Sequence, residues 1–219
     1  MLRVKKYSKN YDNILVCSDT HYGHNRDFLY EPRGFQSDEE HNKWIEEQIE
    51  SLTPDSLLIH LGDIGLSIGP ERIQDFMLSI PCETLTVWGN HNSGVLQLYN
   101  QQLPEGFKNC EVYPLRLTPN ITMMGDEFIL SVDSNNFHCR HMAPLIWDHM
   151  NKEDKRIRKA LIGHSHGNLK GATPDGVGLG KMLDCGVENA KRYNGTAFFS
   201  INEINEIMEK KPLSSVDHH

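Results

Sequence analysis

Apolar and polar positions in the first half of the chain form short apolar runs that alternate with longer segments of helical spacing. The apolar runs predict buried strands at 13–19, 56–63 and 83–90. Between them, 36–52 has helical spacing and carries Ser37 and Glu40 at the spacing of a capping box. Residues 69–80 also have helical spacing, with Pro70 in the first turn. The order strand, helix, strand, helix, strand predicts parallel strands joined by right-handed crossovers.

The second half has shorter apolar segments with turn residues between them. These predict strands at 111–117, 120–125, 127–133, 136–141, 160–164 and 182–186, then a strand and a short helix within 196–210. The charged segment 151–159 predicts an exposed helix, and the glycine-rich segment 169–181 predicts a hairpin or loop. Because no linker or repeat divides the chain, we predict one domain over 1–211. We interpret 212–219, which ends in two histidines, as a disordered tail or the remnant of a purification tag.

Composition narrows the class of protein. The chain has 219 residues and 38% hydrophobic content, with no apolar stretch of membrane-spanning length. The N-terminal residues lack the apolar region and cleavage site of a signal peptide. Five scattered cysteines without CxxC spacing indicate free thiols and a reducing compartment, so we expect a cytoplasmic protein. The net charge of −8 disfavours a long nucleic-acid groove.

Polar clusters follow four of the predicted strands. The clusters are "SDTHYGH" with Asp19 and His21, "GD" with Asp63, "GNHN" with Asn90 and His91, and "GHSHG" with His164 and His166. Because the carboxyl ends of parallel strands line the ligand crevice of an α/β sheet, we expect these side chains to converge on one rim. Carboxylate and imidazole donors suit Mn²⁺, Fe or Zn²⁺. The set is too large for one metal with an open position, so two metals are expected.

These motifs carry a resemblance to a known family. "DTH", "GD", "GNH", an isolated His and "GHSH", in that order from Asp19 to His166, resemble the signature of the calcineurin-like metallophosphoesterase superfamily. The segment "MLDCGVEN" is similar to the "NVGVD" strand of small bacterial and phage members. The resemblance implies an α/β fold: a four-layer α-β-β-α sandwich of two mixed sheets flanked by helices. It also implies a dinuclear metal site at the carboxyl ends of the strands.

The resemblance further implies a ligand set. The first metal is expected on Asp19, His21 and His166, the second on Asn90, His141 and His164, with Asp63 bridging the two. Asn90 and His91 are the expected catalytic residues, with His91 as acid or phosphate-stabilising group. The cofactors implied are two divalent transition-metal ions, with Mn²⁺ favoured and Fe, Zn or Ni as alternatives.

The isolated histidine has three candidates, His138, His141 and His149. We choose His141, because "RHMAP" resembles the family's turn after a strand and His138 would face the other side of that strand. His24 and Arg140 are weaker candidates for substrate binding, and Arg33 is a further cation that could reach a phosphate.

Two departures from the family pattern bear on function. Asn92 stands where the family commonly has Asp or Glu, so it brings no charge to hold His91 protonated. The segment "GDIGLS" lacks the arginine of the protein Ser/Thr phosphatases, which argues against that branch.

We therefore expect a phosphodiesterase that acts on a small nucleotide-like diester by in-line attack of a metal-bridging hydroxide. The alternatives are a phosphomonoesterase, then a nuclease, then a metal-bound scaffold without catalysis. The expected partner is a small phosphoester, with no membrane, and nucleic acid is disfavoured.

Overall fold

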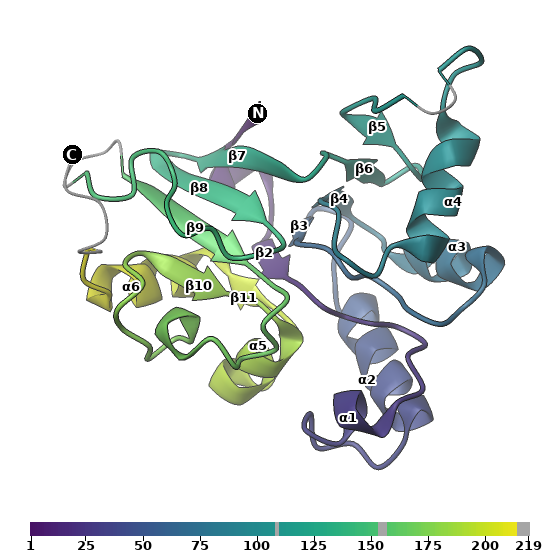
Figure 1. The fold of residues 1–219 in the computed structure, drawn as a ribbon, viewed down its shortest axis with the longest axis horizontal. Coiled ribbons are helices and arrows are strands. Elements are labelled where there is room, and N and C mark those ends of the chain that lie inside the picture. The colour runs from purple at the N-terminus through teal and green to yellow at the C-terminus, as the bar shows by residue number, and fades with distance from the viewer. Residues whose placement is uncertain (108–109, 153–156, 214–219) are drawn as a thin grey trace.

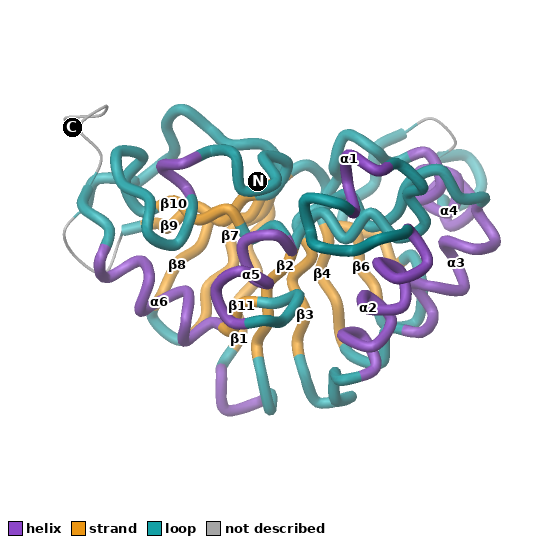
Figure 2. Tube along the Cα trace, turned by 90° about the horizontal axis from the view of Figure 1, so that it is seen from below, coloured by secondary structure: helices purple, strands orange, loops and turns teal. Residues whose placement is uncertain are grey.

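Two β-sheets lie face to face at the centre of the molecule, and helices flank them (Figures 1 and 2). The computed structural model describes residues 1–107, 110–152 and 157–213. Both sheets contain parallel and antiparallel pairs, so the predicted class of two mixed sheets with flanking helices is confirmed.

The larger sheet consists of β2 (Ile14–Cys17), β3 (Leu57–His60), β4 (Glu83–Thr86), β5 (Leu115–Arg116), β6 (Ile121–Met123) and β11 (Phe199–Ser200). Its spatial order is β11-β2-β3-β4-β6-β5. The four central strands are parallel, and β11 and β5 are antiparallel edges. The first three central strands are those that the apolar runs of the N-terminal half predict.

The smaller sheet consists of β1 (Leu2–Lys6), β7 (Glu127–Val132), β8 (Asn135–Arg140), β9 (Arg158–Ile162) and β10 (Met182–Asp184). Its spatial order is β1-β7-β8-β9-β10. β7 and β8 form an antiparallel hairpin, and β8, β9 and β10 are parallel. β1 is parallel to β7 and was not expected from the sequence, because only Leu2 and Val4 of this basic segment pack against the core.

The helices are α1 (Asp27–Tyr30), α2 (Asp38–Glu50), α3 (Pro70–Ser79), α4 (Ser93–Gln102), α5 (Val187–Asn194) and α6 (Ile201–Lys210). The hydroxyl of Ser37 accepts a hydrogen bond from the Glu40 N–H at 3.2 Å and caps α2, and Pro70 opens α3 as its spacing predicts. α1, α4 and α5 were not expected. α1 has only four residues, too few for an apolar period.

Burial divides the core into layers. Alternate residues of the two sheets, such as Val16, Leu130 and Phe137, face one another in one cluster that α6 also joins. A second cluster packs α2, α3 and α4 against the outer face of the larger sheet. The outer face of the smaller sheet is covered mainly by loop residues, among them Trp147 and Met150. The strands are therefore buried on both faces, which explains their continuous apolar runs.

The predicted helix at 151–159 is wrong at its end, because Arg158 and Lys159 belong to β9. Their charges have partners beside the sheet: Arg158 forms an ion pair with Asp148 at 2.6 Å, and the Lys159 ammonium donates to Asn205 at 2.6 Å. Residues 153–156 of that segment, and 214–219 of the predicted tail, lie outside the described residues. None of the described helices has the length and apolar character needed to cross a bilayer.

The layered core makes a stability prediction. Leu130 is fully buried between the sheets, so Leu130→Ala removes packing that the neighbours cannot replace. We expect a loss of about 2–5 kcal/mol in the free energy of unfolding, measured by chemical denaturation. Leu78 is 50% exposed on α3, and Leu78→Ala is the matched control, expected to change stability by less than about 0.5 kcal/mol. Equal losses for the two variants would contradict the assigned core.

Candidate metal centre

The predicted ligands follow five strands that finish at the same edge of the two sheets. Cys17, His60 and Thr86 end β2, β3 and β4 and pair with one another in register, so the loops that follow begin side by side. These loops carry Asp19, His21, Asp63, Asn90 and His91, and the loops after β8 and β9 carry His141, His164 and His166. The site therefore draws residues from both sheets.

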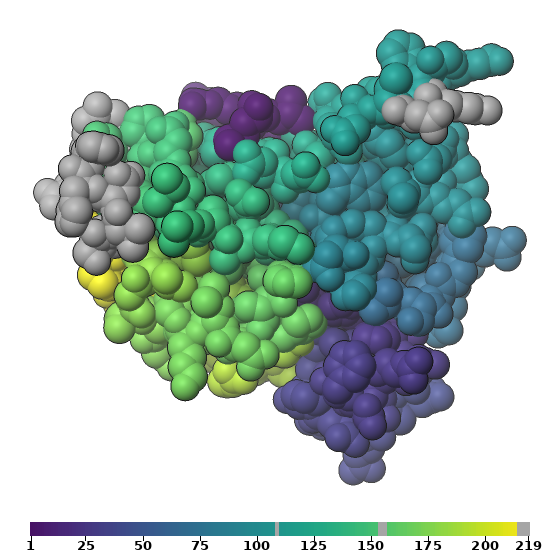
Figure 3. Space-filling model, viewed as in Figure 1, coloured from purple at the N-terminus to yellow at the C-terminus, as the bar shows by residue number. Residues whose placement is uncertain are grey.

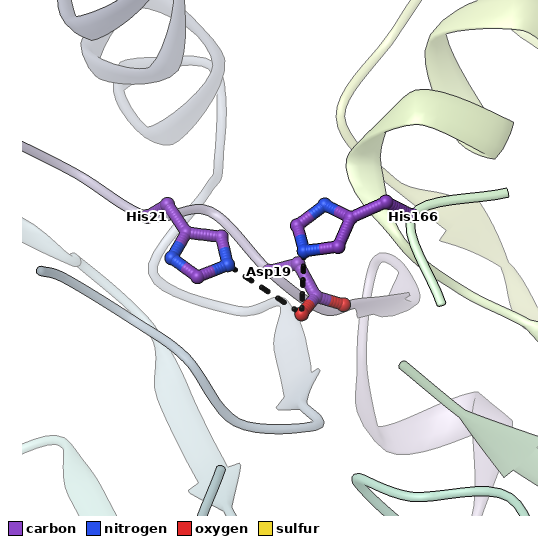
Figure 4. Close-up of side chains that lie close together, drawn as sticks. All are labelled: Asp19, His21 and His166. Atoms are coloured by element: carbon purple, nitrogen blue, oxygen red, sulfur yellow. Dashed lines mark ion pairs between the residues drawn. The ribbon is translucent and has the colours of Figure 1, made fainter. Parts of the chain in front are cut away.

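Asp19 lies at the centre of the first group (Figure 4). Its Oδ1 atom is 3.7 Å from Nε2 of His21 and 3.8 Å from Nε2 of His166. A third imidazole nitrogen, Nε2 of His141, is 4.0 Å away. Asp19 is fully buried, and this oxygen has no hydrogen-bond partner among the described residues. The atoms are too far apart for direct hydrogen bonds, yet close enough for one cation to join them.

Asp63 forms the second carboxylate of the cluster. Its Oδ2 atom is 3.6 Å from Nε2 of His21 and 3.4 Å from Nε2 of His141. Its Oδ1 atom accepts a hydrogen bond from the His91 N–H at 2.8 Å. Asp63 thus contacts members of both predicted ligand groups, as a bridging role requires.

Asn90, His141 and His164 meet on the other side of Asp63. Nδ1 of His141 donates to the Leu61 carbonyl at 2.8 Å, which leaves a lone pair on Nε2 of the neutral ring. That atom is 2.8 Å from Oδ1 of Asn90, and Nδ1 of His164 is 2.7 Å from the same oxygen. With its ring neutral, His141 would direct the Nε2 lone pair at an oxygen that can only accept, so a cation between the two atoms would stabilise them, and these residues fit a second metal ion.

The charges agree with a cation site. Burial alone would raise the pKa of Asp19, but His21, His166 and His141 together lower it well below its usual range. Burial opposes ionisation of Asp63 too, and His141 and the His91 N–H nevertheless lower its pKa. Both carboxylates are therefore ionised at neutral pH, inside a site that has too few fixed positive charges of its own.

The backbone at the site is unusual. Five of the seven predicted ligands adopt positive φ: Asp19 at 58°, His21 at 47°, Asp63 at 54°, His164 at 67° and His166 at 49°. Such left-handed conformations cost about 1 kcal/mol or more for each non-glycine residue, and they cluster at functional sites. Hydrogen bonds between the loops support them: the Asp19 N–H donates to Gly62 at 3.1 Å, and the His21 N–H donates to Asp63 at 3.0 Å.

Two motif glycines are required by close approach. A Cβ atom on Gly89 would lie 2.0 Å from Oδ1 of Asp63. A Cβ atom on Gly163 would lie 1.9 Å from the Ser18 hydroxyl and 2.6 Å from Oδ2 of Asp19. A side chain at either position would push a carboxylate out of the cluster.

Two buried residues hold the first ligand group: Glu188, to which the sequence assigned no role, and Arg33, for which it suggested only a phosphate contact. Oε1 of Glu188 accepts from Nδ1 of His166 at 2.7 Å and from Nε of Arg33 at 2.8 Å. Arg33 also donates to the Asp19 carbonyl at 2.7 Å. Burial opposes the charge on Glu188, but Arg33 and His166 lower its pKa to about 2. Because Nδ1 of His166 donates a hydrogen bond to Glu188, the Nε2 atom of the neutral ring presents a lone pair to the cluster.

Asp184 holds the loop that carries His164 and His166. Its buried Oδ2 accepts from the Ser165 hydroxyl at 2.5 Å and from the Gly167 N–H at 2.9 Å. The only sequence signal for Asp184 and Glu188 was their place in "MLDCGVEN", where no role could be assigned to single side chains.

The structure separates the three candidate histidines. His141 lies within the cluster, whereas Nε2 of His138 pairs with Glu127 at 2.8 Å. His149 lies in a loop beside Asp148, 3.3 Å away. The geometry places His141 among the other predicted ligands, and its role as a ligand stays a prediction.

The remaining candidates lie near the cluster or turn from it. The buried His24 ring lies 5.7 Å from the His21 ring, and burial with nearby His21 and His91 lowers its pKa to about 4. Arg140 is paired with Glu127 at 3.2 Å. Arg33, a possible phosphate contact from sequence, is instead buried and bonded as described above.

His91 is exposed at the rim, and its ring lies 5.6 Å from that of His21. Asn92 does not contact it through its side chain: Oδ1 accepts from the Gly89 N–H at 3.0 Å and Nδ2 donates to the Gly89 carbonyl. Asn92 therefore closes the loop that follows β4.

Comparison with known proteins agrees with this geometry. The family model described as calcineurin-like phosphoesterase matches residues 13–190. The fold is similar to the crystal structure of a protein of unknown function, AQ665 from Aquifex aeolicus, with a TM-score of 0.55 and 16% sequence identity. That similarity covers 89% of this chain and 98% of that chain, and at this identity it concerns the fold alone. No curated protein matches the chain.

Members of the matched family hydrolyse phosphoesters and bind two divalent metal ions, and the cluster supplies Asp and His groups suited to holding them. Because the match spans most of the chain and includes every strand that carries a predicted ligand, the protein belongs to the calcineurin-like phosphoesterase family and is a metal-dependent phosphoester hydrolase.

Proposed function

We propose that the protein is a phosphodiesterase that acts on a small, nucleotide-like diester. The observation that carries the proposal is the pair of ligand groups that share Asp63, with Asn90 and His91 exposed beside them. Seven donors in two groups that meet at one carboxylate suit two metal ions. The exposed rim beside them leaves room for a phosphoester.

The proposed ligands are Asp19, His21 and His166 for one ion and Asn90, His141 and His164 for the other, with Asp63 between them. Bound divalent ions lower the pKa of water and polarise phosphoryl oxygens. Oxygen and nitrogen donors without thiolate favour Mn²⁺, with Fe, Zn or Ni as alternatives.

The residues at the rim have separate tasks. The hydrogen bond from the His91 N–H to Asp63 fixes the backbone of the loop, and the exposed His91 ring lies 5.6 Å from that of His21. We assign this ring the transfer of a proton to the leaving oxygen, and the Asn90 amide a contact with phosphoryl oxygen. Asn92 bonds to Gly89 and so shapes the turn that carries His91 without contacting its ring.

Charge favours a diester over a monoester. A monoester carries a second negative charge, which commonly requires an additional cationic side chain at the phosphate. Arg33 is engaged with Glu188, and Arg140 is paired with Glu127. The role proposed for Arg140 in substrate binding would need its ion pair with Glu127 to open, whereas the role proposed for His24 would not. A phosphomonoesterase is the second candidate.

The proposed partner is a small phosphoester, and the net charge of −8 disfavours nucleic acid. The five cysteines are free, four of them buried, which supports a reducing compartment and hence the cytoplasm.

A direct test uses two chromogenic esters. After chelation and reloading with Mn²⁺, the protein should hydrolyse bis(p-nitrophenyl) phosphate with kcat/KM at least about tenfold above that for p-nitrophenyl phosphate. The reason is that Arg33 and Arg140 are already paired and do not clamp the second charge of the monoester. Protein left free of metal is the control and should be inactive. Faster hydrolysis of the monoester would establish the second candidate instead.

We expect Asp63→Asn and His91→Ala to lower the rate of hydrolysis by different mechanisms. Asp63 lies between both ligand groups, so loss of its charge should lower metal content and rate together, and excess Mn²⁺ should restore part of the activity. His91→Ala should keep metal content and lower the rate by about 10²–10⁴-fold on poor leaving groups, with a smaller loss on p-nitrophenolate.

Elemental analysis and turnover on phenyl and p-nitrophenyl diesters provide the measurements. Loss of metal from His91→Ala would show that this histidine is a ligand.

Glu188→Gln should weaken metal binding although Glu188 is no predicted ligand. Its carboxylate fixes the tautomer and orientation of His166, and changes of this kind typically cost 10–100-fold in metal affinity. The matched control is Glu127→Gln, because Glu127 likewise bonds one histidine and one arginine, His138 and Arg140, away from the cluster. Titration of apo protein with Mn²⁺ should separate the two variants, and equal affinities would refute the supporting role.

A further inference from the structure

A pocket of about 340 Å³ opens beside the first ligand group. One wall is formed by Phe28 and Leu29 of α1 and by Pro32, and the other by Asn168 and Arg192. His166 and Glu188 also line it, so the pocket and the metal cluster share side chains. α1 and α5 stand on either side of this position (Figure 1), and the violet-blue segment that contains α1 adjoins the green part of the chain in the space-filling view (Figure 3).

The apolar wall presents an aromatic ring to a ligand. Phe28 is 69% exposed, whereas its neighbour Leu29 is buried and anchors α1. The Phe28 ring packs edge-on against His24, with centroids 5.4 Å apart and planes at 77°. Because most of the ring is exposed, it is available for another flat group to stack on.

A row of rings connects this wall to the reacting centre. His24 lies 5.7 Å from His21, and His21 is stacked with His166 at 5.1 Å. Phe28 is thus one ring removed from a predicted ligand, and His166 itself forms part of the pocket lining. A substituent on a phosphoryl group held at the cluster would therefore lie next to the pocket.

The opposite wall supplies hydrogen-bond donors. Arg192 is exposed on α5, and its guanidinium has no hydrogen-bond or ion-pair partner among the residues that the structure describes. Asn168 is exposed beside it. Glu188, in contrast, is committed to Arg33 and His166. The free donors suit a ligand whose ring edge carries acceptor atoms.

Other cavities lack this relation to the cluster. A larger one, about 560 Å³, includes Asn13 at the opposite end of β2 and Gln48 of α2. Another of about 350 Å³ lies between α2 and α3 and is lined by Glu46, Glu50 and Asp75, which repel anions. The pocket beside His166 therefore combines an aromatic face, unpaired donors and contact with a predicted ligand.

We infer that this pocket binds one organic substituent of the phosphoester, and that the substituent is a planar aromatic group with acceptor atoms on its edge, as in a nucleobase. Phe28 stacks on the ring, and Arg192 with Asn168 binds its polar edge. The inference deepens the proposed phosphodiesterase function and rests on it for the identity of the substrate.

Non-hydrolysable phosphonates test the inference by binding alone. Calorimetric titration of the Mn²⁺-loaded full chain compares methylphosphonate, phenylphosphonate and 4-nitrophenylphosphonate, each of which has only one organic group. We expect phenylphosphonate to bind about tenfold more tightly than methylphosphonate, the effect of one aromatic stacking contact. The nitro group, which adds acceptor oxygens, should strengthen binding several-fold more.

Two variants assign the contacts. Phe28→Ala should reduce the phenyl-to-methyl preference to less than about threefold, and Arg192→Ala should abolish the gain from the nitro group while it keeps the phenyl preference. Phe107→Ala is the matched control, because Phe107 is 51% exposed beyond α4 and outside the pocket lining. Since Phe28, Phe107 and Arg192 are all exposed, folding should survive, and Tm values check this.

The possible failures are distinguishable. Equal affinity of the unaltered protein for methyl- and phenylphosphonate, or a phenyl preference that survives Phe28→Ala, overturns the inferred pocket even if diesters are hydrolysed. A phenyl preference that depends on Phe28 upholds the pocket even if bis(p-nitrophenyl) phosphate is not turned over, in which case the proposed function alone fails.

Discussion

Two ionised carboxylates, Asp19 and Asp63, are buried at 0% and 2% exposure where the strand ends meet, and the architecture of the site follows from their charge. A buried anion requires compensation by cations or donors. Here the neighbours are imidazoles 3.4–4.0 Å away, too distant for hydrogen bonds, together with backbone N–H groups of His91 and His164. This arrangement is unfavourable for the chain alone and favourable around divalent ions. The backbone reaches this arrangement through left-handed turns and through glycines at positions where a Cβ atom would not fit.

The position of the cluster between the sheets connects metal binding to packing. Asp19, Asp63 and Asn90 come from the larger sheet, whereas His141 and His166 come from the smaller one. Ions held by both sets would link the two layers of the core at this edge. Because such binding favours only the folded arrangement, its free energy adds to that of the inter-sheet contacts.

The sequence predicted which side chains meet at the strand ends because each predicted ligand follows a short apolar run, which is a local property of the chain; their roles as ligands stay predictions. It also predicted the two mixed sheets and α2 and α3. Sequence reasoning failed where the stabilising partner is far away in the chain. Glu188 and Arg33 are 155 residues apart, and β1 is a strand because it pairs with β7. Arg158 and Lys159 indicated a solvated helix, since the partners that make them acceptable in β9 come from other segments. The side chain of Asn92 could not be placed, because its bonds to Gly89 depend on the turn itself.

The left-handed ligand loops also bear on how the protein discriminates among metals. Hydrogen bonds that Arg33 donates and Asp184 accepts, and those that join the loops after β2 and β3, hold these donors in place through protein contacts alone. The chain therefore presents a fixed set of donors and does not wrap around an arriving ion. A rigid set of nitrogen and oxygen atoms follows the intrinsic affinity order of the transition metals, with little conformational penalty against any ion of similar size. Selection among divalent ions of similar size would then depend on the concentrations of free ions around the protein as well as on its own preference.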